Sequence, residues 1–224
     1  MDSSFKPDME ALAKHYGDLV KRYGDGAQSA QYADRETQER RMEVLCEIGV
    51  TKDSKVLDFG CGTGQMLTFL KRSLGFEGEY VGYDISSEAI EFAKSAHSDG
   101  RFEVRDIIEQ PSDETFDFVL LSGVFNNLIT DNRGFFEAVS KRLMAQARVG
   151  YAFNMLSRFV DYFDDGLYYE DPLQALRFCK EQLSPLVTLR HDYSVREGSI
   201  PFEFSIFVYK TDITPRLLGD PGVT

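Results

Sequence analysis

The sequence predicts an α/β fold in which a doubly wound, mostly parallel sheet carries helices on both faces. Short apolar runs alternate along the chain with segments whose apolar residues recur every three or four positions, a pattern typical of strands alternating with amphipathic helices. The first apolar run ends in a glycine-rich turn at residues 60–64. The last two runs are joined only by a turn around residues 196–198, which is too short for a crossover helix, so these two strands are antiparallel.

Composition excludes several classes of partner. The 224 residues are 42% hydrophobic and 28% charged, as in a globular protein with one sizeable core. The formal net charge of −12 disfavours binding to nucleic acid and to anionic membranes. The three cysteines lack CxxC spacing and the amino terminus lacks an apolar signal core. We therefore expect a cytoplasmic protein without a disulfide framework or a metal site.

Two amphipathic helices are predicted ahead of the first strand. In residues 9–23 the apolar positions are three and four apart, and the Gly24-Asp25-Gly26 sequence ends the helix because glycine tolerates a positive φ. The second helix is predicted over residues 34–48, with Met42, Leu45 and Ile48 on its buried face.

Strands and helices then alternate. Strands are predicted at residues 55–59, 80–83, 101–104, 116–121 and 149–153, followed by the antiparallel pair 186–193 and 202–210. The intervening helices are predicted after residue 64 with Met66, Leu67, Leu70 and Leu74 inside, at residues 88–97 with Ser86 or Ser87 as the cap, at residues 134–145, and after the Asp171 cap with Pro172 in the first position.

The glycine-rich turn is the strongest functional signal. Glycines at alternate positions let the backbone turn tightly and approach a ligand, and open α/β sheets bind ligands beyond the carboxyl ends of their strands. Dehydrogenases also use a glycine loop, but their GxGxxG pattern needs a third glycine where this chain has Gln65. Here Asp58 precedes Gly60, Gly62 and Gly64.

Residues 56–64 resemble the first motif of the class I S-adenosylmethionine-dependent methyltransferases, an acidic residue followed by GxGxG. Further matches follow in the family's order: Asp84 ends the second strand, Asp106 follows the third, and residues 116–122 resemble the fourth-strand motif that lies under the methionine moiety. The resemblance implies S-adenosylmethionine as the cofactor, with S-adenosylhomocysteine as the product. It also implies a seven-stranded sheet of order 3-2-1-4-5-7-6 with strand 7 antiparallel.

The resemblance also implies roles for single residues. Asp84 would accept hydrogen bonds from both ribose hydroxyls, while Asp106 would hold the adenine amino group and Ile107 would pack on its ring. Arg41 shares a helix face with Gln38 and stands where similar enzymes place Arg or Gln against the cofactor carboxylate. The expected cofactor-binding set is completed by Asp58, Gly60, Cys61, Gly62, Thr63, Gly64, Ile85 and Ser122.

Several alternatives stay open for these residues. Asp84 is also consistent with a helix-capping carboxylate, Asp106 with an ordinary acid at a strand end, and Arg41 with a solvated charge. Cys61 is expected to contribute its backbone rather than act as a nucleophile. For the chain as a whole, we expect residues 1–50 to cover the cofactor site, residues 51–210 to form a single methyltransferase domain, and residues 211–224 to be a loose tail.

The methyl acceptor is expected beside the loop after the fourth strand, residues 122–127. Many small-molecule methyltransferases carry a histidine hereabouts, whereas this chain has Asn126 and Asn127, which can orient a substrate but cannot take its proton. Phe125 in the same loop is a candidate substrate contact. The Asp/Asn-Pro-Pro-Tyr motif of adenine- and glutamine-methylating members is absent, which counts against DNA and protein-amide acceptors.

Residues 159–170 mix aromatic and acidic side chains and are expected to close over the acceptor, with Tyr168 and Tyr169 as contacts. The alternative is an apolar segment packed on its own protein. His191 is the best titratable candidate for a base, but in the family's strand order its edge strand lies ~14 Å from strand four. The two features together resemble small bacterial methyltransferases of polysaccharide and natural-product pathways.

The sequence therefore predicts methyl transfer to an oxygen or nitrogen of a small molecule, such as a sugar or a natural-product intermediate. We expect a monomer or homodimer that needs no metal. The alternatives are a protein methyltransferase, a non-catalytic partner protein that keeps the cofactor fold, and a nucleotide-dependent oxidoreductase.

Overall fold

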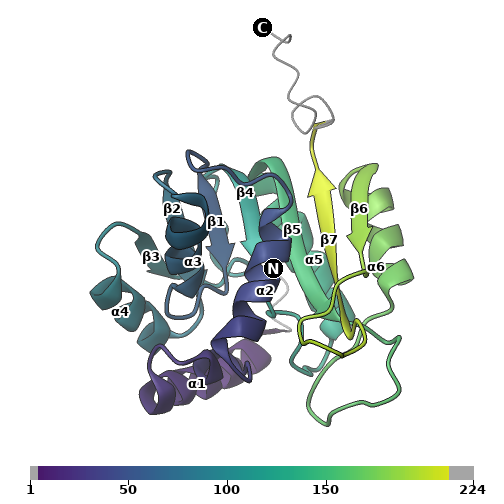
Figure 1. Ribbon diagram of the computed structural model, residues 1–224, viewed down its shortest axis with the longest axis horizontal. Helices are drawn as coiled ribbons and strands as arrows, with labels where there is room; N and C mark the ends of the chain where they lie inside the picture. Colours follow the sequence, from purple (N-terminus) through teal and green to yellow (C-terminus); the bar gives the residue numbers. More distant parts are fainter. Residues whose placement is uncertain (1–4, 212–224) are drawn as a thin grey trace, which may run out of the picture.

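Seven strands form the central sheet in a computed structural model that describes residues 5–211 (Figure 1). They are β1 Val56–Phe59, β2 Tyr80–Asp84, β3 Arg101–Val104, β4 Phe116–Leu121, β5 Ala147–Leu156, β6 Leu186–Arg190 and β7 Glu203–Tyr209. Their order across the sheet is β3-β2-β1-β4-β5-β7-β6. Only β7 is reversed, because it pairs antiparallel with both β5 and β6. The fold class, the strand order and the reversal of strand 7 are confirmed.

The helices begin where the sequence supplies a side-chain cap. Asp34, Ser86, Asp131 and Asp171 each accept a backbone N–H bond at the start of a helix, which satisfies amides that have no partner within the helix. Ser86 rather than Ser87 caps the helix after β2. The helical segments are α1 Lys6–Tyr23, η2 Ala27–Ala30, α2 Arg35–Cys46, α3 Gln65–Leu74, α4 Ser87–Ala96, α5 Asn132–Gln146, α6 Pro172–Phe178 and η3 Cys179–Leu183.

The sheet separates two apolar layers, because successive side chains of a strand point to opposite faces. On β1, Val56 packs with residues of α2, α3 and α4, whereas its neighbour Leu57 packs with residues of α5 and α6. The four residues of β1 are all buried, as expected for a parallel strand that is covered on both faces. Within residues 5–211, none of the helices has both the length and the apolar character needed to cross a membrane.

Three details differ from the sequence-based expectation. Leu74 is 38% exposed, because it is the last residue of α3 and the chain leaves the helix at Gly75, whose φ is 60°. The fifth strand continues to Leu156, beyond the predicted end at residue 153. The sixth strand ends at Arg190, so His191 lies in the following connection. The predicted tail lies, apart from residue 211, outside the described residues.

The N-terminal helices close one end of the sheet. Figure 1 shows α1 lying across the end at which β1 and β4 finish, and an ion pair of 2.7 Å between Lys21 and Glu88 joins α1 to α4. The chain then returns through η2 to α2, which packs on the sheet. This path places α1 and η2 over the carboxyl ends of the central strands.

Candidate active site

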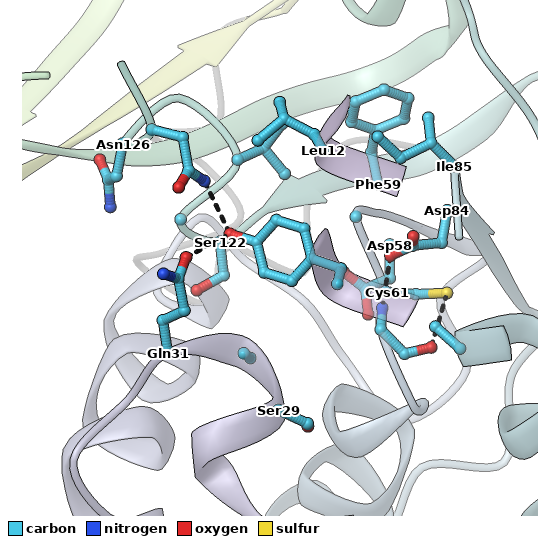
Figure 2. Close-up of a pocket in the computed structure, with 18 of the residues that line it drawn as sticks. Leu12, Ser29, Gln31, Asp58, Phe59, Cys61, Asp84, Ile85, Ser122 and Asn126 are labelled. Atoms are coloured by element: carbon cyan, nitrogen blue, oxygen red, sulfur yellow. Dashed lines mark hydrogen bonds between the residues drawn. The ribbon is translucent and has the colours of Figure 1, made fainter. Parts of the chain in front are cut away.

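A cavity of about 230 Å³ lies between the N-terminal helices and the carboxyl ends of β1, β2 and β4 (Figure 2). One wall comes from α1, η2 and the residues that follow η2, including Leu12, Tyr16 and Gln31. The opposite wall comes from loops that follow the strands: Gly60, Cys61, Gly62, Thr63, Asp84, Ile85, Arg105, Asp106, Ile107, Ser122, Gly123, Val124, Asn126 and Asn127. Most of the site residues predicted from the sequence are therefore brought to one cavity.

The glycine-rich turn has the open geometry that close ligand approach requires. Gly62 has a φ of 52°, and a Cβ added there would meet nothing within 4 Å, so the backbone is bare on its cavity side. Gly64 differs, because it is the N-cap of α3 at a φ of 84° and an added Cβ would collide with the His97 ring. Gly64 is therefore needed for packing and does not line the cavity, unlike the role predicted for it.

Asp84 ends β2 with its carboxylate fixed by the backbone. One oxygen accepts the Gly62 N–H at 2.9 Å and the other accepts the Ser86 N–H at 2.8 Å. Each oxygen keeps a second lone pair. Burial raises the pKa of Asp84, although these backbone hydrogen bonds oppose the shift. The carboxylate is thus a preformed hydrogen-bond acceptor beside the glycine turn.

Asp58 lies deeper, on β1, with its side chain buried beneath the same turn. It accepts a hydrogen bond of 2.5 Å from the hydroxyl of Tyr80. Burial raises the pKa of Asp58 to about 7, against the effect of the Tyr80 bond. Asp58 lines the cavity, and its bond to Tyr80 ties β1 to β2 directly below the loop.

Asp106 and Ile107 form the far end of the cavity after β3. An Asp106 oxygen accepts the Ile108 N–H at 2.8 Å, which holds the turn and leaves acceptor capacity on the carboxylate. Ile107 is 1% exposed and Ile85, after β2, is half-buried; both line the cavity. Two apolar side chains and the carboxylates of Asp84 and Asp106 thus contribute to the lining of one cavity.

The loop after β4 is tied to the N-terminal helices by side-chain hydrogen bonds. The hydroxyls of Ser122 and Tyr32 lie 3.1 Å apart, and the Asn127 amide donates to the Tyr16 hydroxyl at 2.7 Å. Asn126 is held differently, because its side-chain oxygen accepts the Leu156 N–H at 3.1 Å. Neither Tyr16 nor Tyr32 is among the site residues predicted from the sequence. Tyr16 falls on the apolar face of the predicted helix 9–23, and Tyr32 falls in the connection before the next helix.

Arg41 lines the cavity, but its charge is already paired. The guanidinium donates to Glu203 on β7 at 2.7 Å and to the Thr37 carbonyl at 2.7 Å, and it lies over the Tyr32 ring. Both Arg41 and Glu203 are almost fully buried. The alternative of a solvated helix charge is therefore wrong, and Glu203 is a partner that no sequence motif indicated.

Two of the predicted acceptor contacts lie elsewhere. Phe125 is 2% exposed within an aromatic cluster, with its ring 5.2 Å from that of Phe136, and it does not line the cavity. The Tyr168 hydroxyl donates to Glu170 at 2.9 Å, and this side chain also stays outside the lining. These aromatic residues pack because the apolar sheet face beside α5 and α6 buries them.

Leu167 takes the place expected of Tyr168. It lines the cavity and forms an isolated bridge with Asn127. Tyr169 lines an adjacent hollow next to Tyr32 and Arg41, and its hydroxyl accepts the Asp164 N–H at 3.1 Å. The neighbouring Phe159, Tyr162 and Phe163 are about half exposed. Residues 159–170 therefore reach the cavity rim through Leu167.

His191 lies apart from the cavity. Its ring stacks on Phe159 at a centroid distance of 5.9 Å and meets the Phe204 ring edge-on. It is not among the residues that line the cavity. The structure therefore gives no support to His191 as a base for a substrate bound beside residues 122–127.

Comparisons with known proteins agree with this geometry. Residues 50–152 match a family model described as a methyltransferase domain. The Mycobacterium tuberculosis protein Rv1506c, whose name assigns it to the methyltransferases, is 35% identical over 159 residues, which are 68% of this chain and 91% of that protein. The demethylmenaquinone methyltransferase of Staphylococcus aureus is 32% identical over 92 residues, 39% of this chain and 38% of that enzyme.

Solved structures of similar fold contain the expected cofactor. The magnesium protoporphyrin IX methyltransferase of Synechocystis PCC 6803 with bound S-adenosylmethionine aligns with a TM-score of 0.66 at 15% identity, covering 91% of this chain and 97% of that chain. The plantazolicin methyltransferase BpumL with S-adenosylhomocysteine aligns with a TM-score of 0.63 at 14% identity, covering 92% of this chain and 99% of that chain. The similarity to the mycobacterial relative, the match to the family model and the shared fold together show the family. This chain belongs to the class I S-adenosylmethionine-dependent methyltransferases.

Proposed function

We propose that this protein transfers the methyl group of S-adenosylmethionine to a small molecule bound beside residues 122–127. The observation that carries the proposal is that one cavity is lined both by the glycine turn with Asp84 and by the Ser122, Asn126 and Asn127 side of the β4 loop. A donor site and an acceptor site joined in one enclosed space are what direct methyl transfer requires.

The residues fit the cofactor in shape and in chemistry. The open backbone at Gly62 leaves room for the ligand, and the free lone pairs of Asp84 suit the two ribose hydroxyls. Ile85 and Ile107 offer apolar surface to the adenine ring, and Asp106 offers an acceptor to the ring's amino group. Gln38 and Arg41 also line the cavity. Because Arg41 is already paired with Glu203, the Gln38 amide is the group of the two that would meet the cofactor carboxylate.

The chemistry asks little of the protein beyond alignment. S-adenosylmethionine supplies an activated methyl group on a sulfonium, so the chain's task is to hold the acceptor in line and to exclude water. Residues from α1 and η2 would form the cover over residues 51–210 that excludes water, with Leu12 and Tyr16 facing the strand ends.

A small acceptor is favoured by the enclosure of the site. The cavity is bounded by α1, η2 and Leu167, which leaves limited room for a folded protein substrate. The magnesium protoporphyrin and plantazolicin methyltransferases of similar fold are named for small-molecule and natural-product substrates. A protein methyltransferase and a non-catalytic partner protein remain the competing functions. We also propose a reducing, cytoplasmic location, which the unpaired thiols of Cys46, Cys61 and Cys179 support.

Calorimetry and product analysis test this function together. S-adenosylmethionine and S-adenosylhomocysteine should bind, while NAD and ATP should give no heat of binding. Incubation with small-molecule acceptors should yield S-adenosylhomocysteine in amounts that match the methylated product. Tight NAD binding without any signal from S-adenosylmethionine would contradict the proposal, and cofactor binding with transfer only to proteins would favour the alternative.

A further inference from the structure

A tyrosine of the first helix reaches the acceptor end of the cavity. Tyr16 lines the cavity together with Asp84 and Asn127. Its hydroxyl donates to the side-chain oxygen of Gln31 at 2.9 Å and accepts from the Asn127 amide at 2.7 Å. Figure 2 shows the Gln31 amide directed into the cavity from the residue that follows η2. The hydroxyl is therefore fixed at the boundary between the cover and the β4 loop.

These bonds leave hydrogen-bond acceptors facing the site. The Tyr16 oxygen has a second lone pair after accepting from Asn127. The Asn127 amide uses its nitrogen for this bond, so its oxygen remains available for another donor. The Tyr16 phenol is protonated and uncharged at neutral pH, and burial raises its pKa further, to about 12. A ligand that carries N–H donors would be held here.

The charged groups of the cavity argue against oxygen acceptors. The carboxylates of the lining, Asp58, Asp84 and Asp106, belong to the part of the cavity proposed for the cofactor, and no histidine is found among the lining residues within the described range 5–211. An alcohol beside residues 122–127 would therefore meet no residue of that loop able to act as a base. The arginines of the lining are both paired, Arg41 with Glu203 at 2.7 Å and Arg105 with Glu103 at 2.7 Å. A carboxylate acceptor would thus find no unpaired cation among them. A neutral nitrogen nucleophile needs neither a base to activate it nor a cation to bind it.

We propose that the Tyr16 hydroxyl and the Asn127 amide bind the nucleophilic atom of the acceptor, and that this atom is a weakly basic amine nitrogen, as in an arylamine. This inference rests on the proposed function. The N–H donates to the Tyr16 oxygen, so the nitrogen lone pair can turn toward the methyl carbon. The N–C bond forms as the S–C bond breaks and sulfur keeps the electron pair. The methylated nitrogen then gives up a proton to bulk water as the product leaves the enclosed site.

Binding of two cofactor analogues tests the position of Tyr16 without knowledge of the acceptor. Sinefungin carries an amine in place of the sulfonium methyl group, whereas S-adenosylhomocysteine has no group there. Tyr16→Phe should weaken sinefungin binding about three- to tenfold, as expected for one lost hydrogen bond. The same substitution should change the affinity for S-adenosylhomocysteine by less than about twofold. Tyr23→Phe is the matched control, since Tyr23 is 39% exposed on the same helix.

An equal loss for both analogues in Tyr16→Phe, or no loss for either, would overturn the assigned position of Tyr16. The acceptor class is tested by mass spectrometry after incubation with methyl-deuterated S-adenosylmethionine and a panel of arylamines, phenols, alcohols and carboxylic acids. Labelled N-methyl products, with kcat/KM at least about fivefold lower in Tyr16→Phe, support the inference. Transfer only to oxygen, or none to the arylamines, overturns it. Failure of the wild-type protein to bind S-adenosylhomocysteine would instead count against the proposed function.

Discussion

The two halves of the cavity are built in different ways. In the cofactor half, defined by residues 58–64, 84–85 and 105–107, the carboxylates of Asp84 and Asp106 accept from backbone amides of the turns at the strand ends, as Asp84 accepts from Gly62 and Ser86. In the acceptor half, defined by residues 122–127 and the side chains that meet them, the bonds join distant segments, as between Tyr16 and Asn127. The first half depends on turns at the ends of neighbouring strands, and the second depends on the docking of α1, η2 and β7.

The largest effect that this comparison predicts is on stability, at the buried ion pair of Arg41 and Glu203 that joins α2 to β7. Arg41→Ala leaves Glu203 buried without its cation, and removing one partner of such a pair costs about 3–5 kcal/mol. We expect the free energy of unfolding in urea to fall by that amount. Arg40→Ala, on the same helix in an exposed pair with Glu43, should cost less than about 1 kcal/mol. Similar losses in both variants would contradict the role of the pair.

The cofactor half should respond in ligand affinity. Asp84→Ala removes a charged acceptor from two ribose hydroxyls, so we expect the binding free energy of S-adenosylmethionine to weaken by about 2–4 kcal/mol. The Gly62 and Ser86 amides also lose their acceptor, which should lower the unfolding free energy by about 1–2 kcal/mol. Calorimetry and urea unfolding measure the two effects. An unchanged dissociation constant would remove Asp84 from the site, and Glu91→Ala on the exposed side of α4 is the control.

Asp58 makes the stability of the cofactor half depend on pH. Its pKa is about 7 in the folded chain, above the value of about 4 in an unfolded chain. The stabilisation by the neutral carboxyl is complete below pH ~4 and is lost as the pH rises through about 7, with a slope of at most ~1.4 kcal/mol per pH unit. Asp58→Asn should flatten this dependence in urea unfolding between pH 5 and 7. If the unfolding free energies of the wild type and of Asp58→Asn changed with pH in parallel, this role of Asp58 would be refuted.

The smallest effect is expected at the rim of the acceptor half. Leu167→Ala removes apolar contact from the cavity lining, so the KM for the acceptor should rise about threefold, or ~0.7 kcal/mol. Affinity for S-adenosylhomocysteine should stay within about twofold. Tyr168→Phe is the control, because its hydroxyl is bound to Glu170 outside the lining. A larger rise in the acceptor KM in Tyr168→Phe than in Leu167→Ala would instead support the sequence-based expectation that Tyr168 contacts the acceptor.

The same contrast explains what the sequence could predict. Asp84 ends β2, Ile107 lies three residues after β3, and Ser122 directly follows β4. Because the carboxyl ends of parallel strands meet at one edge, a linear motif locates these residues in space. Nothing linear connects Tyr16 to Asn127 or Arg41 to Glu203, because these pairs lie 111 and 162 residues apart. Their contacts depend on how α1 and β7 dock.

Within residues 159–170, aromatic character was a poor guide to the cavity lining. Phe159 and Phe163 are exposed, and the aliphatic Leu167 faces the cavity. Which side chain of this segment turns inward is set by the bridge between Leu167 and Asn127 and by the bond from the Tyr168 N–H to the Asn126 carbonyl. Backbone pairing of this kind has no signature in composition.

A crystal structure of the protein with S-adenosylhomocysteine tests the central claim most directly, that one cavity holds the cofactor against Asp84 and presents its sulfur to Tyr16 and Asn127. The account predicts both ribose hydroxyls within about 3.2 Å of the Asp84 carboxylate. It also predicts the adenine ring between Ile85 and Ile107, with the sulfur on the side of the cavity that carries the Tyr16 hydroxyl. A ligand bound outside this cavity, or one whose sulfur points away from residues 122–127, would contradict it.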